Sequence, residues 1–338
     1  MSKARSSSKN LVILTTHFGM NFSGGSTATH EIFKRLEDEF DQIVVICNKI
    51  GDHRFKKAEF RLFSNIWEAY KILRSISNRD IIYYGDFYNS VLFVWAKKKF
   101  YFTYHDNWPE MKNTSSYDYI KSIFYIPAYK AILRSAEKVI AVSKYKKRFI
   151  EKFNSGVKVV YNGYNVSEDK DKNQFREKNK IIMVGNIDRR KYHIARRLFK
   201  SIDPDFKGEI DIYGHLINKD LAEKLNSFSF VNIKGFVPSI PYRSYNCLLH
   251  TSIIENLPIA LCEAIIHHLP VVAFDVGGIS EVVNPSNGIL VPPFDVTRMK
   301  HSIDSILSGK QEFSFSNNDL ANFNWDIAAR EYLKIMQS

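Results

Sequence analysis

The stretch "SIIENLPIALCEAIIHHLPVVAFDVGGISEVV", Ser252 to Val283, joins the exit of one apolar strand to a helix and then to a second strand. Pro258 suits the first helical position, where its missing N–H costs nothing and its fixed φ favours the helix. We therefore predict a helix from about Pro258 to His268, followed by a buried strand over 270–274. A strand, a helix and a strand in this order are typical of a parallel sheet covered by helices.

The same alternation runs along the whole chain of 338 residues. Helical spacing separates the strands, as over Thr27–Glu39 and Ile66–Ser77. In the first half we predict strands at 11–16, 43–48, 80–85, 100–104, 138–143 and 157–162, and in the second half at 181–185, 209–214, 230–235, 247–252, 270–274 and 288–291. The predicted fold class is α/β, with two doubly wound Rossmann-like domains.

A polar and charged segment separates the two halves: "GYNVSEDKDKNQFREKNK", Gly163 to Lys180, has almost no apolar periodicity. We predict an N-terminal domain over 1–163, a linker over 164–180 and a C-terminal domain over 181–315. The domains are expected to face across a cleft, with ligands at the carboxyl ends of the strands.

Composition limits the cellular setting. The three cysteines, Cys47, Cys247 and Cys262, are widely spaced, which argues against a disulfide framework or a zinc site. The N-terminal apolar run is too short for a secretion signal, and no run reaches the roughly 20 residues of a membrane span. We therefore expect a cytoplasmic protein.

The basic excess lies in the first half of the chain. Residues 1–165 contain 27 Lys+Arg and 15 Asp+Glu, whereas residues 166–338 contain 21 of each kind. This asymmetry suggests contact of the first half with a polyanion, either the inner face of an anionic membrane or a nucleic acid. A solvated basic surface explains the excess equally well.

Glu255 and Glu263 stand eight positions apart, on either side of the predicted start of the helix at Pro258. The free N–H groups and partial positive charge of that helix end suit a phosphate. Carboxylates bind neighbouring sugar hydroxyls well, so each acid could hold a sugar on one side of the phosphates. The alternative is a cap acid and an unrelated surface acid.

Arg190 and Lys191 follow the strand over 181–185 and open the next helix. An Arg fork and a Lys point charge at a strand end are suited to phosphate oxygens. The alternative is a basic helix surface, which is our interpretation of Arg196 and Arg197.

Two loops in the first half are also candidates. Gly24 and Gly25, in the segment that begins at His17, let backbone approach a ligand at a helix start. His105 and Asp106 end the strand over 100–104. An ordinary turn and a structural histidine are the alternatives.

The order of these pieces resembles the retaining glycosyltransferases of family 4, which have the GT-B fold. The resemblance is carried by Glu255-x7-Glu263 with "LPVVAFDVGGISEVV" and "NGILV", and by segments in both halves. Those segments are "FSGGSTATHEIFKRL", "FTYHDN", "AEKVIAVSKYKKRFI", "VVYNGYN", "MVGNIDRRK" and the closing "FNWDIAAREYLKIM". The resemblance implies that residues 316–338 end in a helix that packs back on the N-terminal domain.

The resemblance implies a role for each site residue. Glu263 would hold the ribose of a nucleoside-diphosphate sugar, Glu255 the transferred sugar, and Arg190 with Lys191 the diphosphate. The N–H groups of Asn256 and Leu257 would assist, Gly24 and Gly25 would lie at the donor, and His105 would contact the reacting sugar or the acceptor. His17 and Asp106 would lie on the acceptor side. The sequence departs from the family pattern at three positions. Asn186 stands where an Arg is frequent, Tyr192 where a Gly usually follows the Lys, and His268 where a Gly often precedes the next strand.

The implied reaction is metal-independent, retaining transfer of a hexose or N-acetylhexosamine to a glycan or lipid-linked acceptor, without a cofactor, in the synthesis of surface polysaccharide or lipopolysaccharide. The segment "SSYDYIKSIFYIPAYKAILRS" mixes aromatic and basic residues, and is either a membrane-facing acceptor helix or an ordinary surface helix. A nucleotide-sugar 2-epimerase of the same fold, a nucleic-acid-binding protein and an inactive scaffold are the competing hypotheses.

Overall fold

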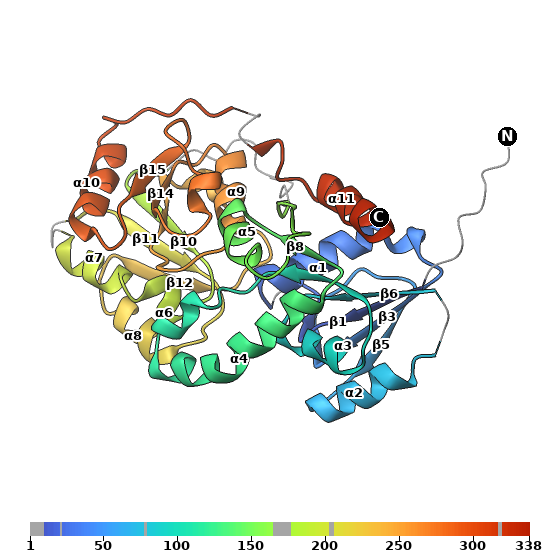
Figure 1. Cartoon of the computed structure of the whole chain (residues 1–338). Coiled ribbons are helices and arrows are strands. Elements are labelled where there is room, and N and C mark those ends of the chain that lie inside the picture. The colour runs from blue at the N-terminus through green and yellow to red at the C-terminus, as the bar shows by residue number, and fades with distance from the viewer. Residues whose placement is uncertain (1–9, 21, 78–79, 165–176, 203–205, 317–319) are drawn as a thin grey trace, which may run out of the picture. The chain divides into compact units, whose positions relative to one another are not determined.

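The computed structural model describes residues 10–20, 22–77, 80–164, 177–202, 206–316 and 320–338. The chain divides into two compact units, Met1–Gly163 with Asn322–Ser338, and Tyr164–Ala321 (Figure 1). The predicted linker falls largely on residues 165–176, which lie outside the described residues. Each unit is built around its own parallel sheet.

The first unit contains a seven-stranded sheet in the order β5-β3-β1-β6-β7-β8-β9. Every neighbouring pair of strands in it is parallel. The strands are β1 (Asn10–Leu14), β3 (Gln42–Cys47), β5 (Ala58–Leu62), β6 (Ile81–Gly85), β7 (Phe100–Tyr104), β8 (Lys138–Ala141) and β9 (Lys158–Val159). The strand order reverses at β1, which pairs with β3 on one side and β6 on the other.

Helices cover both faces of this sheet (Figure 1). On one face lie α2 (Ile66–Ser75), α3 (Val91–Trp95), α4 (Ser116–Ser135) and α5 (Lys144–Ile150), whose apolar side chains share one core cluster with the strands. On the other face α1 (Gly24–Arg35) packs against α11 (Trp325–Gln337), and Phe33 and Tyr332 contact Tyr84 of β6. The C-terminal helix is thus part of the first unit.

The second unit contains a six-stranded parallel sheet in the order β12-β11-β10-β13-β14-β15. Its strands are β10 (Lys180–Val184), β11 (Glu209–Tyr213), β12 (Val231–Gly235), β13 (Cys247–His250), β14 (Val271–Phe274) and β15 (Gly288–Val291). Its helices are α6 (Arg189–Tyr192), α7 (Ala195–Ser201), α8 (Lys219–Asn226), α9 (Ile259–Ile266) and α10 (Val296–Leu307). Here β10 is the strand at which the order reverses.

The predicted strands are present, but several details were wrong. The edge strand β5, "AEFRL", and the short pair β2 (His17–Phe18) and β4 (Lys49–Ile50) were not predicted, because half-exposed and two-residue strands have little apolar pattern. The strand predicted over 157–162 shortens to β9. The first helix begins three residues before Thr27, because Ser23 caps it and exchanges hydrogen bonds with Ser26.

The helix predicted from Pro258 to His268 is also shorter than expected. Pro258 is its cap, with an extended backbone (φ −80°, ψ 114°), and α9 ends at Ile266. His268 follows with a left-handed backbone (φ 55°), and its ring stacks on Phe315. A left-handed backbone favours glycine, which explains why glycine is frequent here in the resembling family. None of the helices in the described ranges combines the length and apolarity needed to cross a membrane.

Candidate functional site

The strand order of the second unit brings two candidate loops together. Because β10 and β13 are neighbours, the loop that carries Arg190 and Lys191 lies beside the loop that carries Glu255. Ligands of open parallel sheets bind at the carboxyl ends of the strands where the order reverses. The sequence placed these residues at strand ends, and the pairing of β10 with β13 makes them one site.

Two hydrogen bonds hold the loops in register. The backbone N–H of Ile253 donates to the carbonyl of Arg190 (3.0 Å), and the hydroxyl of Thr251 donates to the carbonyl of Lys191 (2.6 Å). Asp188 caps α6 by accepting a hydrogen bond from the N–H of Lys191 (3.0 Å). The cations at the start of α6 are therefore fixed relative to the loop after β13.

A buried charge cluster forms between the loops. Oε1 of Glu255 lies 3.7 Å from Nζ of Lys191 and 3.3 Å from Nε2 of His250. Burial alone would raise the pKa of Glu255, but Lys191, His250 and Arg190 outweigh it and hold that pKa well below its usual range. Burial lowers the pKa of His250 and outweighs the effect of Glu255, so the imidazole is neutral near pH 7. The carboxylate of Glu255 is therefore ionised, and the charges of Lys191 and Arg190 stabilise it.

Gly185 and Tyr192 shape the first of these loops. Gly185 has φ +139°, and a Cβ placed there would lie 2.6 Å from Nζ of Lys191. The hydroxyl of the buried Tyr192 donates to the carbonyl of Gly185 (3.0 Å) and closes the loop. Tyr192 thus has a packing role in place of the family glycine, and Gly185 leaves room for the lysine side chain.

The turn at Gly277 supports Glu255 from another side. Gly277 has φ +62°, and a Cβ there would lie 1.7 Å from the carbonyl oxygen of Glu255. No side chain fits at that distance, so only glycine allows the turn to approach the backbone of Glu255.

Glu263 lies in α9, beyond the helix end that follows Glu255. The hydroxyl of Tyr242 donates to Oε2 of Glu263 (2.8 Å), and the Tyr242 ring stacks on His267. Burial raises the pKa of Glu263 to about 7, against the opposing effect of the Tyr242 hydrogen bond. Asn256 and Leu257, between Glu255 and the cap Pro258, are buried. Pro258 makes no side-chain cap hydrogen bond, because the proline ring carries no acceptor.

The first unit brings two of the predicted loops together. Gly24 and Gly25 are the first residues of α1, and His105 follows β7. A Cβ at Gly25 would lie 3.0 Å from Cβ of His105 and 3.1 Å from the ring of Phe87. Burial lowers the pKa of His105 to about 3, so this imidazole is neutral. The turn at Gly24 and Gly25 and the loop of His105 therefore lie against each other at the carboxyl edge of the first sheet.

His17 and Asp106 have local partners. The ring of His17 stacks on Phe22 at 4.9 Å, and burial together with Lys49 lowers its pKa. Asp106 accepts a hydrogen bond from the hydroxyl of Tyr129 in α4. Both residues therefore help to order the loops that hold them.

Three residues of interest were not predicted from the sequence. His250 is the last residue of β13, and Tyr242 precedes that strand. Asp86 is fully buried after β6 and accepts a hydrogen bond from Thr29 (2.6 Å), and burial raises its pKa to about 7. A polar residue directly at a strand end was the available signal for His250 and Asp86, whereas nothing in the sequence connects Tyr242 with Glu263. Among the described residues, no three His, Cys, Asp or Glu side chains gather in an arrangement that could hold a metal ion.

Comparison of the chain with models of known protein families identifies its family. Residues 22–168 match the model described as "Glycosyltransferase Family 4", and residues 165–318 match the one described as "Glycosyl transferases group 1". The chain belongs to glycosyltransferase family 4. The second of these matches includes both loops of the candidate site in the second unit of this glycosyltransferase.

Solved structures show the same fold for this glycosyltransferase. HepE from Anabaena, solved with UDP-glucose, is 17% identical over 96% of this chain and 99% of its own, with a TM-score of 0.76. Sucrose-phosphate synthase from Thermosynechococcus elongatus is 16% identical over 97% and 98%, with a TM-score of 0.76. WaaG, a glycosyltransferase involved in lipopolysaccharide biosynthesis, is 16% identical over 96% and 95%, with a TM-score of 0.71. The glycosyltransferase therefore has the GT-B fold, with two Rossmann-like units, as predicted. A comparison with curated proteins finds no significant sequence match.

Proposed function

We propose that this glycosyltransferase transfers a hexose or N-acetylhexosamine, with retention, from a nucleoside-diphosphate sugar to a glycan or lipid-linked acceptor of a surface polysaccharide or lipopolysaccharide. The observation that carries the proposal is the cluster of Lys191, Glu255 and His250 beside the start of α9. The names of two structural neighbours, HepE with UDP-glucose and WaaG of lipopolysaccharide biosynthesis, point the same way.

In this proposal the donor lies along the carboxyl edge of the second sheet. The guanidinium of Arg190 and the ammonium of Lys191 bind the diphosphate together with the N–H groups of Asn256 and Leu257. Glu255, ionised and close to these cations, accepts hydrogen bonds from hydroxyls of the transferred sugar. Glu263, farther along α9, accepts those of the ribose, in competition with Tyr242.

The proposed reaction takes place on one face of the sugar. The bond between C1 and the diphosphate oxygen breaks, the acceptor oxygen bonds to C1 from the same side, and the acceptor proton passes to the departing phosphate. Arg190, Lys191 and the helix end stabilise the negative charge that develops on the leaving group. In this proposal the neutral His105 contacts the reacting sugar or the acceptor. The scheme uses protein cations in place of a metal and requires no cofactor.

Calorimetry with a panel of nucleoside diphosphates and their sugars tests donor binding. One nucleotide is expected to bind, and Glu263→Ala and Lys191→Ala to weaken it about tenfold or more. Lys200→Ala, an exposed cation of α7 in the same unit, is the matched control and is expected to bind normally. If no nucleotide binds the wild-type protein, the donor site is wrong.

A second measurement separates transfer from epimerisation. Incubation with the bound nucleotide sugar and a lipid-linked acceptor should give an α-linked product from an α-linked donor, observed by NMR at the anomeric proton. Release or epimerisation of the sugar in the absence of any acceptor would favour the nucleotide-sugar 2-epimerase instead.

We also propose that the protein works in the cytoplasm at the inner face of an anionic membrane. The basic excess of residues 1–165 supports this contact, since cations near an anionic leaflet each contribute about 1 kcal/mol to binding. A lipid-linked acceptor would be met at that surface.

A further inference from the structure

The helix α4 is apolar on two opposite faces. One face buries Tyr129, Ile132 and Leu133 in the core of the first unit. The other presents large side chains to solvent, with exposures between 59% and 71%: Tyr117, Tyr119, Ile120, Ile123 and Phe124. A helix that only covered a sheet would carry polar residues there. A large exposed apolar patch on a soluble protein marks an interaction surface.

A second aromatic group lies in the same helical layer. Trp67 of α2 and Trp95 of α3 stack on each other with ring centroids 6.2 Å apart, yet they are 66% and 48% exposed. The helices α3 and α4 are in contact, and α2 and α3 contribute to the same core cluster as α4. Exposed tryptophans are rare in soluble proteins and frequent where a protein meets a lipid headgroup region.

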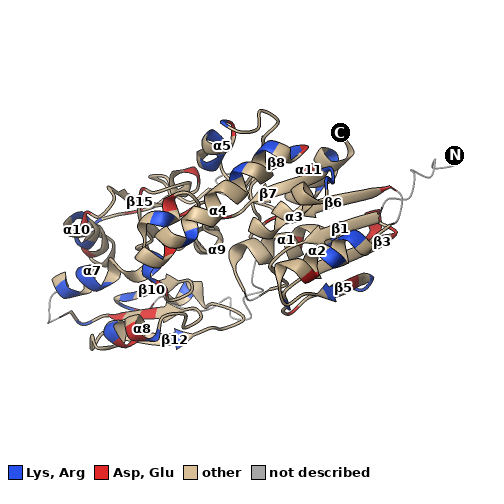
Figure 2. Ribbon diagram, turned by 60° about the horizontal axis from the view of Figure 1, so that its bottom comes forward, with Lys and Arg blue, Asp and Glu red and all other residues tan. Residues whose placement is uncertain are grey.

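Cations surround both groups of apolar side chains. Lys97, Lys98 and Lys99 follow Trp95 after one residue, and Lys130 and Arg134 continue the exposed side of α4 toward its C-terminus. Figure 2 marks Lys and Arg positions of α2 and α4 in blue. The ammonium of Lys121 lies over the rings of Tyr117 and Tyr125, at 4.3 and 5.9 Å.

The acidic side chains of these helices are engaged locally. Glu68 of α2 accepts hydrogen bonds from the N–H and hydroxyl of Ser64, and Asp118 of α4 accepts them from the hydroxyls of Thr114 and Ser115. These hydrogen bonds do not remove the two negative charges, but α2, α4 and residues 97–99 together carry eight Lys and Arg side chains, so the surface around the exposed aromatic residues is net cationic.

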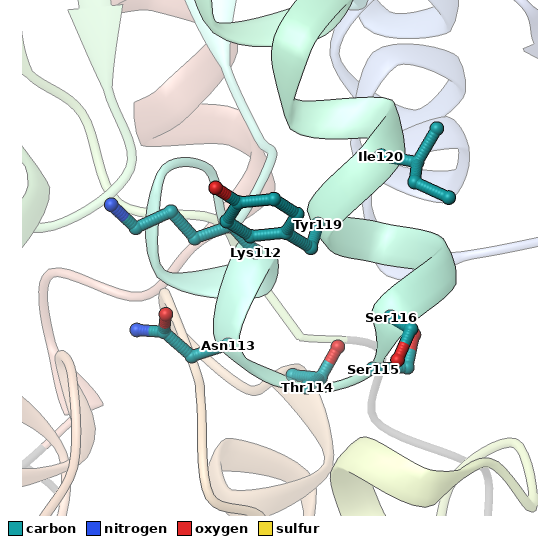
Figure 3. Close-up of a pocket in the computed structure, with 7 residues that line it drawn as sticks. All are labelled: Lys112, Asn113, Thr114, Ser115, Ser116, Tyr119 and Ile120. Carbon is teal, nitrogen blue, oxygen red and sulfur yellow. The ribbon is translucent and has the colours of Figure 1, made fainter.

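A shallow hollow opens at the start of α4. It is lined by Lys112, Tyr119 and Ile120 together with residues 113–116. Figure 3 shows the amino group of Lys112 and the hydroxyl of Tyr119 extending to the same side, whereas Ile120 extends away from them. A cation, a hydroxyl and apolar side chains in one place match a phosphate headgroup with its acyl chain.

We propose that the outer surface of α2, α3 and α4 docks this protein on an anionic lipid bilayer. Trp67, Trp95 and the exposed side chains of α4 enter the headgroup region, and the surrounding lysines bind lipid phosphates. The aromatic half of α4 begins after the loop of His105, at the carboxyl edge of the sheet, so docking brings that edge to the bilayer. The inference rests on the proposed membrane contact and assigns it to defined residues.

Co-sedimentation of the full chain with vesicles tests the proposal. Vesicles of phosphatidylcholine with phosphatidylglycerol are expected to bind the protein, and vesicles of phosphatidylcholine alone to bind it weakly. Two aromatic variants, Trp67→Ser with Trp95→Ser and Ile123→Ser with Phe124→Ser, should each reduce the partition constant about tenfold or more. Lys97→Glu with Lys99→Glu should do the same and remove most of the dependence on salt.

Matched changes in the second unit are the controls. Leu216→Ser with Ile217→Ser, and Lys219→Glu with Lys224→Glu, alter exposed apolar and charged residues there and are expected to leave vesicle binding unchanged. Circular dichroism and nucleotide binding of every variant should match the wild type, so a failed donor site would be distinguished from a failed docking surface.

Several results would overturn the proposal. If the aromatic variants bind anionic vesicles as tightly as the wild type does, this surface does not contact the bilayer. If the protein binds neutral and anionic vesicles equally well, the lysines do not bind lipid phosphates. Self-association without vesicles, abolished by the α4 variant in sedimentation velocity, would assign the surface to a second copy of the chain.

Discussion

The ammonium of Lys191 lies 3.7 Å from the carboxylate of Glu255, although 64 positions separate the two residues in the chain. Their loops meet because β10 and β13 are neighbours where the strand order of the second sheet reverses. The buried carboxylate of Glu255 depends on this cation, because an unpaired buried charge is costly, and in the proposed function the same lysine binds the diphosphate.

Lys191→Met is expected to weaken both the fold and the site. Loss of the ammonium leaves the buried carboxylate of Glu255 without its closest cation, so the free energy of unfolding should fall by about 1–3 kcal/mol. Nucleotide affinity should fall about tenfold or more. Urea unfolding and calorimetry measure the two effects, with Lys200→Met as control; unchanged affinity would exclude Lys191 from the phosphate site.

Glu263→Gln is expected to stabilise the free protein above neutral pH. The pKa of Glu263 is raised from 4.5 to about 7, so its unfolded carboxyl ionises at a lower pH than its folded one. The contribution of Glu263 to the free energy of unfolding is therefore fully present below about pH 4.5, and it is lost as the pH rises through about 7. Glutamine removes that loss, which we place at about 1–3 kcal/mol.

The test is urea unfolding of wild type and Glu263→Gln at about pH 4 and about pH 8, with the variant more stable only at the higher pH. The same variant should bind the nucleotide less tightly, because the amide offers one acceptor oxygen in place of two. Equal stability at both pH values would contradict the raised pKa.

His105→Ala is expected to lower kcat about tenfold to a thousandfold, with little change in nucleotide affinity. The pKa of His105 is lowered to about 3, so the imidazole remains neutral above pH 5. The pH profile of kcat should therefore show no step from this residue between about pH 5 and pH 8. Steady-state kinetics measure both effects, and a step near pH 6.5 that disappears in the variant would contradict a neutral His105.

Gly277→Ala is expected to destabilise the second unit by about 2–4 kcal/mol. Its Cβ would lie 1.7 Å from the carbonyl oxygen of Glu255, in addition to the strain of φ +62°. Gly309→Ala is the matched control, with φ +72° and no atom within 4 Å of the new Cβ. The control should lose only about 1 kcal/mol in urea unfolding, and equal losses in the two variants would mean that the turn moves away from Glu255 without cost.

The sequence by itself determined the architecture, because burial and periodicity are local properties of the chain. Apolar strands alternating with helical patterns predicted two parallel sheets, and the positions of Arg190, Lys191, Glu255 and His105 at strand ends predicted which edges carry the site. The weakly patterned β5 and the exact ends of α9 were missed, since edge strands and helix termini depend on their neighbours.

Only the tertiary structure decided which of these residues meet. The pairing of β10 with β13 places Lys191, His250 and Glu255 together, and the approach of Gly277 depends on a turn after β14. Strand order is a long-range property, because many orders bury the same apolar strands equally well. The exposure of Trp67, Trp95 and the second apolar face of α4 was decided in the same way, since a hydrophobic pattern cannot tell which face of a helix finds a partner.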